Sequence, residues 1–370
     1  MRITVFGGGG FFGRLVLAEL AAEGHYQLLS AGRSVPDVGL PCTTVQLDAT
    51  AAGLDHRLAE HAPDLVINCA GPFEEEWYAV VEAALACGSH YLDLADRRSY
   101  VLGIRRFDAT ARRAGLTVLS GVSSVPALSS AVVAAHRPEF LQVSAIDIGI
   151  SASERVPGPG AVISVLGQCG QALPAGPTGH RPRAAAWTDR FSVDLPRPVG
   201  VRVMASCDVP DLELLPAWIP GLSRVTFRAG VASAWVMRGL RTFARLRQRG
   251  WIRRPRAWAA PMAAAARLLY PFGNGASGMF VRLSGTSLRG EALVVCWQLV
   301  ARDCQGVRVA ARGVVAAAQR LRTQSLASGA RPCCMELTVQ EYLGDLPVMT
   351  RVARLTGEAA RQDELRWCSV

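Results

Sequence analysis

Lysine is absent from this chain of 370 residues, so all 40 basic residues are arginine. Without lysine there is no amine for a Schiff base, no P-loop lysine and no Tyr-x-x-x-Lys pair of the short-chain dehydrogenase type. The absence therefore excludes these chemistries at once. The formal net charge is +10, and we attribute the preference for arginine to genomic base composition rather than to function.

The chain also lacks the patterns of a secreted, membrane-spanning or metal-binding protein. Its ten cysteines show no C-x-x-C spacing, and no cluster of His, Cys and carboxylates has metal-ligand spacing. No apolar stretch reaches the roughly 20 residues of a membrane span, and the first strand leaves no room for a signal peptide. We therefore expect a cytoplasmic protein with reduced thiols and no metal. Its length suffices for two domains.

What the chain does have is a glycine-rich turn near its start. An apolar strand is predicted over 2–6 and a helix over 14–20, and the turn between them fits G-x-G-x-x-G. The first glycine permits the tight turn, the second lets a pyrophosphate approach, and the third lets the helix pack closely. Free N–H groups at the helix start attract phosphates, so we predict a dinucleotide site, with a flexible loop as the alternative. The expected contacts are Gly8, Gly10, Phe11, Phe12 and Gly13.

The residues after the second predicted strand, 27–31, indicate which nicotinamide cofactor binds. NAD sites commonly place an acidic residue there for the ribose 2′-OH, whereas this chain has Arg33 and Ser34. A cation and a hydroxyl suit a 2′-phosphate, so NADP(H) is favoured over NAD(H). Asp48, after the third predicted strand at 43–47, either reaches the adenine or caps the next helix.

The first 125 residues alternate between strands and helices, which predicts an α/β fold. We expect further strands at 64–68, 90–94 and 117–120, and helices at 76–86 and 100–114. Such alternation is typical of a Rossmann doubly wound parallel sheet with helices on both faces. Ligands in these sheets bind beyond the carboxyl ends of the strands, so the loops there should open onto one cleft.

From about Pro126 the pattern changes to that of an α+β domain. Strands are expected at 143–151, 199–204 and 224–230, with a hairpin around 288–290. We therefore predict an NADP-binding domain over 1–125, a substrate or dimerisation domain over 126–335, and a segment 336–370 packing back on the first domain. A helix is also predicted over 307–322, and it would lead the chain back toward the first domain.

Three runs resemble the saccharopine dehydrogenase-like family: 5–13, 66–73 and 88–94. The Asn-Cys-Ala-Gly-Pro-Phe run is fairly specific for that family, and Gly-x-His-Tyr-x-Asp is an independent match. Within that family the chain resembles bacterial members of unassigned substrate, including those akin to trans-acting enoyl reductases of lipid and polyketide pathways. The resemblance implies a reductase whose nicotinamide lies over the second run, in contact with Cys69, Ala70, Gly71 and Pro72. It also implies a homodimer.

Hydride transfer often needs a proton donor beside the nicotinamide. His90, Tyr91 and Asp93 cluster at one predicted strand end, and strand alternation puts Tyr91 and Asp93 on the same face. Tyr91 would donate a proton that Asp93 orients, with His90 as a second candidate acid. The alternative is structural, with Tyr91 in the core, Asp93 capping a loop and His90 at a strand edge.

Residues after the Gly-Pro turn are candidates for substrate contacts. The chain carries Glu74, Glu75 and Glu76 where many relatives have small residues, so a saccharopine-like substrate is not implied. One of these carboxylates would bind an amine, or all three would favour a helix N-terminus. The substrate candidates are Phe73, Glu75, Ser123 and Ser124.

A basic segment stands apart from these motifs. Residues 237–256 carry eight arginines and no acid, and 258–271 are nearly all apolar. Such a pair either rests on a membrane surface, docks an acidic carrier protein through 237–271, or is a solvated helix face. Nucleic acid is not expected, because aromatics are not interleaved as a stacking platform.

Two functions follow from the sequence. The first is an NADP(H)-dependent oxidoreductase that transfers hydride to a C=N, C=O or activated C=C bond of a small or carrier-bound metabolite. The alternative is a non-catalytic NADP-binding or membrane-associated protein of the same fold.

Overall fold

The structure is a computed structural model that describes residues 1–34, 38–71, 73, 77–153, 159–179, 184–268, 275–323 and 326–368. It contains two compact units: 1–128 with 307–344, and 129–306 with 345–370. The units divide the chain differently from the expected domains, because 307–335 belongs to the first unit and 345–370 to the second. Residues 329–332 pair with 117–120 in the first sheet, and residues 348–356 pair with 293–301 in the second. The sequence does not display these pairings, and they decide the assignments.

The first unit is a seven-stranded sheet in the order β3-β2-β1-β4-β5-β6-β13, with every neighbouring pair parallel. This confirms the Rossmann α/β fold. Its strands are β1 (Arg2–Phe6), β2 (Gln27–Gly32), β3 (Thr43–Gln46), β4 (Leu65–Asn68), β5 (His90–Asp93), β6 (Thr117–Ser120) and β13 (Gly329–Pro332). Its helical segments are α1 (Phe11–Ala22), α2 (Leu54–Ala59), α3 (Ala79–Ala86), α4 (Arg98–Gly103), η1 (Ile104–Phe107), α5 (Asp108–Arg113), η2 (Ser124–Leu128), α11 (Gly306–Thr323) and α12 (Val339–Leu343).

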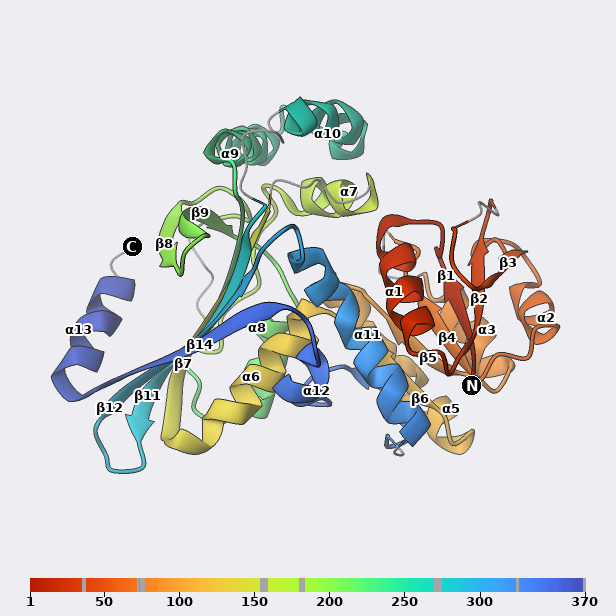
Figure 1. Cartoon of the computed structure of the whole chain (residues 1–370). Helices are drawn as coiled ribbons and strands as arrows, with labels where there is room; N and C mark the ends of the chain where they lie inside the picture. Colours follow the sequence, from red (N-terminus) through yellow and green to blue (C-terminus); the bar gives the residue numbers. More distant parts are fainter. Residues whose placement is uncertain are drawn as a thin grey trace. The chain divides into compact units, whose positions relative to one another are not determined.

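The strands of the first unit are mostly buried on both faces, as is typical of a parallel sheet, except the edge strand β3, which is partly exposed. Val66, Tyr91 and Val118 share one core cluster with residues of α2, α3 and α4. Helix α1 packs on β1 and β2, and the ion pair between Glu19 and Arg308 ties it to α11. Figure 1 shows α1 and β1 side by side, joined by the short glycine turn.

The helix expected over 100–114 is broken into α4, η1 and α5. The Tyr78 hydroxyl donates to the Tyr100 carbonyl at 2.8 Å, which offers that carbonyl a partner outside the helix. Gly103 lies directly against the same hydroxyl, and any side chain there would collide with it. The break in the helix thus lies where the buried Tyr78 contacts it. The sequence of residues 100–114 does not indicate this contact.

The second unit is a mixed sheet in the order β14-β12-β11-β7-β10-β9-β8, in which β7 and β10 are parallel and the other pairs antiparallel. The expected α+β class and the β11–β12 hairpin are confirmed. Its strands are β7 (Phe140–Ala152), β8 (Phe191–Leu195), β9 (Gly200–Ser206), β10 (Arg224–Val231), β11 (Ser277–Ser287), β12 (Ala292–Ala301) and β14 (Val348–Thr356). Its helical segments are α6 (Ser129–His136), η3 (Arg137–Glu139), α7 (Pro159–Gln168), α8 (Asp211–Trp218), α9 (Ala234–Gln248), η4 (Pro255–Trp258), α10 (Ala259–Leu268) and α13 (Gly357–Cys368).

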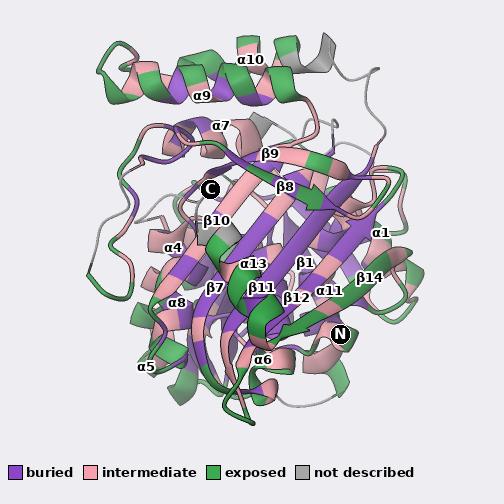
Figure 2. Ribbon diagram, turned by 90° about the vertical axis from the view of Figure 1, so that its left-hand side faces the viewer, coloured by how far each residue is buried: buried purple, intermediate pink, exposed green. Residues whose placement is uncertain are grey.

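Three groups of helices surround the second sheet. Helices α6 and α8 cover one face and α13 the other, while α7, α9 and α10 gather at one end (Figure 1). Figure 2 shows that β11 and β12 are almost wholly buried beneath α13, whereas α9 and α10 expose much of their surface. The central strands are therefore the core of this unit.

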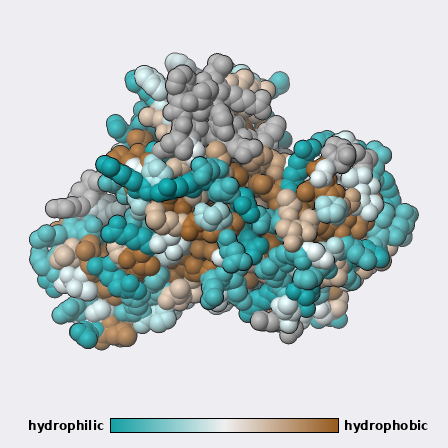
Figure 3. Space-filling model, viewed as in Figure 1, coloured by the Kyte–Doolittle hydropathy of each residue, from teal (hydrophilic) through white to brown (hydrophobic). Residues whose placement is uncertain are grey.

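The outer edge of the first unit, on the right of Figure 3, is predominantly hydrophilic. Nine cysteines within the described residues are free thiols. In the part of the chain that the structure describes, no helix combines the length and apolar character needed to cross a membrane.

Candidate functional site

The glycine turn between β1 and α1 is tightly held by its own backbone. Gly7 has φ +73°, the left-handed region that favours glycine, and its N–H donates to the Ala31 carbonyl at 2.8 Å. The Gly10 N–H donates to the Gly7 carbonyl at 2.8 Å, and Gly10 is the N-cap of α1 without a side-chain cap. The helix therefore starts at the carboxyl edge of the sheet with its first N–H groups near the turn.

A Cβ atom added to each motif glycine would have a different effect. At Gly8 it would collide with the Ser30 hydroxyl, and at Gly13 with the Gly7 carbonyl. At Gly10 its one neighbour within 4 Å is the Gly7 oxygen at 3.0 Å, and Gly10 itself is exposed. Gly8 and Gly13 thus serve the packing of the turn, while Gly10 leaves open space where a pyrophosphate fits. The residues present fit the cofactor.

The expected ribose-phosphate contacts lie at the edge of this turn. Arg33 and Ser34 are exposed directly after β2. Asp48 accepts the Thr50 N–H at 2.9 Å and hydroxyl at 2.8 Å, and these bonds, with the nearby guanidinium of Arg33, lower the pKa of its carboxyl. Asp48 does not cap a helix, because the N-cap of α2 is Gly53. Arg33 and Asp48 are therefore neighbours at the expected adenosine end.

The turn after β4 depends on a buried asparagine. The Oδ1 of Asn68 accepts the Ala70 N–H at 3.0 Å, and its Nδ2 donates to the Tyr91 hydroxyl at 3.2 Å. Ala70 also closes on the first turn, since a Cβ on Gly7 would lie 2.9 Å from its nitrogen. Asn68 thus fixes the turn that would lie beneath the nicotinamide. Cys69 is half-buried there, and desolvation raises the pKa of its thiol.

Other residues of this turn are only partly described. Gly71 is exposed, and Phe73 packs on Tyr100 with ring centroids 5.1 Å apart. Pro72 and Glu75, expected to contact cofactor and substrate, lie outside the described residues, as do Glu74 and Glu76.

Tyr91 and Asp93 come together, but both are fully buried. The Tyr91 hydroxyl lies 3.3 Å from that of Tyr100, and burial raises its pKa well above the ordinary value. The Oδ1 of Asp93 accepts the N–H groups of Gly121 at 2.8 Å and Ala95 at 3.0 Å. Desolvation raises the pKa of Asp93 to about 6 in spite of these bonds. This geometry suits loop positioning, the structural role considered for both residues.

His90 lies at the amino end of the strands, opposite the end where the glycine turn lies. It begins β5 and pairs with Leu65, whereas Asp93 pairs with Asn68 at the carboxyl edge. Its Nδ1 accepts the Thr117 N–H at 2.9 Å, and desolvation lowers the pKa of the imidazole. The expectation that His90 lies on the cleft side is therefore corrected: the strand direction places it at the amino edge, away from the glycine turn.

Ser123 and Ser124 lie in the loop after β6. The Ser123 hydroxyl donates to the Ala310 carbonyl of α11 at 3.2 Å, and the Ser124 side chain bonds to Tyr342. Both serines are only partly exposed. In the described structure they hold α11 and α12 against the first sheet, and their role as substrate contacts remains a prediction.

Two functional groups escaped the sequence analysis. Arg14, in the first turn of α1, donates through Nε to the Gly9 carbonyl at 3.1 Å and adds positive charge beside the glycine turn. Its signal was the basic residue directly after the motif. Asn68 was part of a recognised run, and the signal for its role was a polar residue closing an apolar strand.

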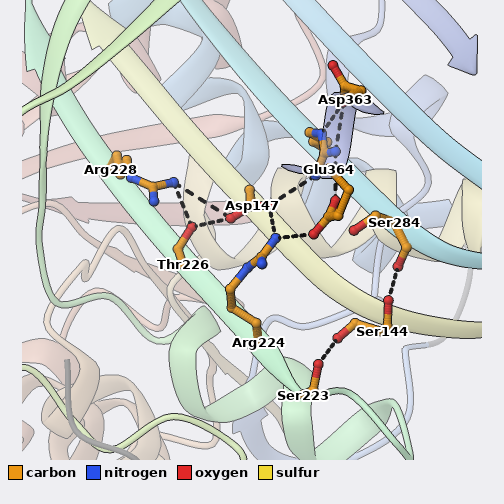
Figure 4. A network of polar contacts seen from close by, with 10 residues as sticks. Ser144, Asp147, Ser223, Arg224, Thr226, Arg228, Ser284, Asp363 and Glu364 are labelled. Atoms are coloured by element: carbon orange, nitrogen blue, oxygen red, sulfur yellow. Dashed lines mark hydrogen bonds and ion pairs between the residues drawn. The ribbon is translucent and has the colours of Figure 1, made fainter. Parts of the chain in front are cut away.

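A second polar cluster lies within the other unit, around Asp147 of β7 (Figure 4). This carboxylate is 1% exposed and accepts the Thr226 hydroxyl at 2.6 Å. Its arginine partners, at nitrogen–oxygen distances of 3.1, 3.3 and 3.6 Å, are Arg224, Arg282 and Arg228. Three cations around one buried carboxylate would leave an excess of positive charge.

Helix α13 supplies the missing negative charge. Arg282 pairs with Asp363 and Glu364 at 2.7 Å each, and Arg224 pairs with Glu364 at 2.7 Å (Figure 4). Desolvation opposes ionisation of Glu364, but these arginines lower its pKa to about 2. A cavity of about 230 Å³, lined by Arg282, Trp367 and other residues, lies beside the cluster. Because the cluster is formally neutral, we assign it to the docking of α13.

Comparison with known proteins defines the class. Residues 3–119 match the family model for the saccharopine dehydrogenase NADP binding domain. The parallel sheet, the glycine turn and this match are those of an NADP-dependent oxidoreductase. Residues 3–119 are therefore a saccharopine dehydrogenase-type NADP-binding domain, and the cofactor is NADP(H), as the sequence predicted.

The solved structures show the fold over a longer stretch. Apo histidine-tagged saccharopine dehydrogenase (L-Glu forming) from Saccharomyces cerevisiae has a TM-score of 0.66 at 14% identity, covering 96% of this chain and 99% of that one. Biliverdin reductase from Synechocystis, in complex with biliverdin and NADP+, has a TM-score of 0.42 at 12% identity, covering 92% and 94%. At these sequence identities the similarity is one of fold alone. No curated protein sequence matches the chain.

Proposed function

We propose that the chain is an NADP(H)-dependent oxidoreductase that transfers hydride to a C=N, C=O or activated C=C bond of a small or carrier-bound metabolite. The observation that carries the proposal is the open space at Gly10, at the start of a helix that carries Arg14 in its first turn, with Arg33 exposed directly after the neighbouring strand β2. These groups bind a pyrophosphate and a 2′-phosphate through backbone N–H groups and cations.

The chain's own residues would position the cofactor rather than exchange protons with it. When bound, NADPH supplies the hydride. Asn68 holds the Ala70 N–H at 3.0 Å and so orients the turn that would face the nicotinamide. Tyr91 and Asp93 stand behind that turn, buried and with raised pKa values. We assign Asn68, Tyr91 and Asp93 as positioning residues, with Tyr91 and Asp93 as acids only if the turn opens.

The second candidate is a non-catalytic NADP-binding protein of the same fold. It is favoured by one observation: Cys69, Tyr91 and Asp93, which lie nearest the turn, all have raised pKa values through desolvation. Tyr91 and Asp93 are also fully buried, and a proton donor must lie within hydrogen-bonding reach of the group that it protonates.

One experiment separates the two candidates. Purified protein is titrated with NADPH and NADH, following quenching of tryptophan and energy transfer to the dihydronicotinamide. It is then supplied with 4-deuterated NADPH and panels of imines, ketones and enoyl thioesters. Micromolar NADPH binding with deuterium in a product supports the oxidoreductase. Binding without transfer supports the second candidate, and no binding at several hundred micromolar contradicts both.

A further inference from the structure

The second unit contains a long stretch without negative charge. Between Glu213 and Glu291 there are 77 residues, none acidic, and 13 of them are arginine. Helix α9 and the segment to Trp258 lie within this stretch. Any anion that approaches it meets no repulsion from the stretch itself.

Helix α9 has an exposed face opposite its buried one. Met237, Leu240, Phe243 and Ala244 form its buried face. The exposed residues recur at intervals of three and four, which places them on the opposite face. They are Trp235, Arg238, Thr242, Arg245 and Arg249. Figure 2 shows α9 as an outer layer with exposed residues along its length.

A separate arginine fixes this helix in place. The Nη1 of Arg247 donates to the carbonyls of Leu166, Gly167 and Cys169 at 2.9, 2.6 and 2.9 Å, at the end of α7. A Cβ on Gly170 would press on the α9 backbone at Ala244. The outward face of α9 is therefore held by close packing beneath it.

Exposed tryptophans flank the cations. Trp235 is 71% exposed, Trp251 76% and Trp258 50%. Arg253 and Arg254 are exposed between the last two. We call Trp235, Arg238, Arg249, Trp251, Arg253, Arg254 and Trp258 the arginine–tryptophan surface.

The cations of the arginine–tryptophan surface differ in their partners from other arginines of the chain. Among the described residues none of them pairs with a carboxylate, in contrast to Arg112, Arg331 and Arg354, which do. The next helix, α10, continues with exposed small apolar residues at 260–261 and 264–265. Unpaired cations, exposed indoles and an apolar helix thus adjoin along the chain.

We propose that the arginine–tryptophan surface docks on a lipid bilayer that contains anionic lipids, with α9 lying in the plane of the headgroups. Arginine binds lipid phosphates, and tryptophan is stabilised at headgroup depth, where one end of the ring meets water and the other hydrocarbon. The indoles favour a membrane over an acidic protein, because a bilayer accepts them without preformed pockets. The proposal is independent of the chemistry at the NADP site.

The test is co-sedimentation of the full chain with phosphatidylcholine vesicles, with and without phosphatidylglycerol. Binding is expected only with phosphatidylglycerol and is expected to fall with salt. Brominated lipids should quench tryptophan fluorescence of the bound wild-type protein, which places the indoles at the bilayer without any substitution. Binding equal on neutral vesicles, or no binding to anionic ones, overturns the proposal, and the latter would turn attention to an acidic protein partner.

Two sets of variants test the site itself. The change Arg249→Glu, Arg253→Glu and Arg254→Glu is expected to weaken vesicle binding about 100-fold. The matched set Arg289→Glu, Arg302→Glu and Arg351→Glu, also exposed, changes the net charge equally and is expected to weaken it only about 2-fold. Equal losses would show a net-charge effect and overturn the proposal.

The indole contribution has its own control. Trp251→Ala is expected to weaken binding about 10-fold, whereas Trp218→Ala, which removes a 55% exposed tryptophan of α8, should leave it unchanged. Circular dichroism and thermal melting confirm that each variant is folded. An unchanged affinity of Trp251→Ala, together with no quenching by brominated lipids, would overturn the membrane assignment.

Discussion

Arg33 is an exposed cation directly after β2, beside Asp48. We expect Arg33→Asp to weaken NADPH binding by about 2 kcal/mol, roughly 30-fold, because it removes a charge-assisted contact and adds repulsion. NADH, which lacks the 2′-phosphate, should bind nearly as before. The measurement is the fluorescence titration of both cofactors, with the exposed Arg105→Asp as control. Equal losses for both cofactors would show that Arg33 does not contact the phosphate.

Gly10 and Gly13 should separate binding from folding. Gly10→Val fills the space expected for the pyrophosphate, so NADPH binding should be lost while the melting temperature changes little. Gly13→Ala drives a Cβ into the Gly7 carbonyl, so the domain itself should be destabilised, by about 1–3 kcal/mol. Thermal melting and the titration, run on both variants, test this contrast. Similar melting temperatures for the two would contradict it.

Asp211 makes stability depend on pH. It is fully buried at the start of α8, it accepts the Ser129 hydroxyl, and desolvation raises its pKa from 3.8 to about 6. A raised folded-state pKa means that its contribution to stability is complete below pH 3.8 and is lost as pH rises through 6. Relative to wild type, Asp211→Asn should therefore gain up to about 3 kcal/mol in free energy of unfolding between pH 4 and 7. Urea melts at several pH values measure this, and a constant difference would refute it.

At the scale of single elements, α13 is held on the second sheet by ion pairs as well as by the packing of Trp367 on Phe191 and Phe280. Asp363 and Glu364 pair with Arg282, whose side chain is also stacked 4.9 Å from the ring centre of Trp367. The double change Asp363→Asn and Glu364→Gln should weaken docking by about 2 kcal/mol. Hydrogen exchange of residues 357–368 should then be roughly 30-fold faster, while NADPH affinity stays the same.

A control keeps that experiment specific to the cluster. Glu358→Gln alters a carboxylate on the same helix whose partners among the described residues, Arg361 at 3.7 Å and the Gln362 amide at 3.3 Å, lie on that helix too. Exchange in α13 should not change in this variant. If it rises as much as in the double variant, the cluster around Asp147 is not what holds the helix.

At the scale of the whole molecule, the NADP-binding residues lie in one of two compact units. NADPH should therefore stabilise the unit that contains the glycine turn, by about 2.7 kcal/mol at a concentration 100 times its dissociation constant. NADH at the same concentration should stabilise it less. Differential scanning calorimetry of the full chain measures the shift. An equal shift with either cofactor would contradict the assigned preference for NADP(H).

The sequence predicts the first sheet well because each element there has a local signal. The glycine turn, the apolar strands and the turn glycines follow each other closely, and neighbouring strands come from consecutive segments except where β4 lies beside β1 and β13 beside β6. Strand β13 is different: it joins β6 from more than 200 residues away. No local pattern in Gly329–Pro332 specifies that partner, so the domain boundary at 335 was wrong.

The candidate site likewise has residues that the sequence identified and residues whose burial or position it could not predict. The turn residues and Arg33 could be identified from the sequence because each belongs to a short motif of consecutive residues. The burial of Tyr91 and Asp93, and the position of His90 at the far edge, depend on which strand end meets the cofactor and on what packs above it. Alternation along a strand gives the face of a residue but not its exposure.

The sequence by itself determined the Rossmann domain, its NADP(H) preference and the excess of positive charge in residues 237–256, because short-range patterns encode backbone turns and local composition. Only the tertiary structure decided that β13 completes the first sheet, that α13 neutralises the arginines of the second, and that Asn68 orients the Ala70 turn. These depend on contacts between residues distant in the chain, whose partners are selected by packing and by the cost of leaving buried charges and hydrogen-bonding groups unpaired.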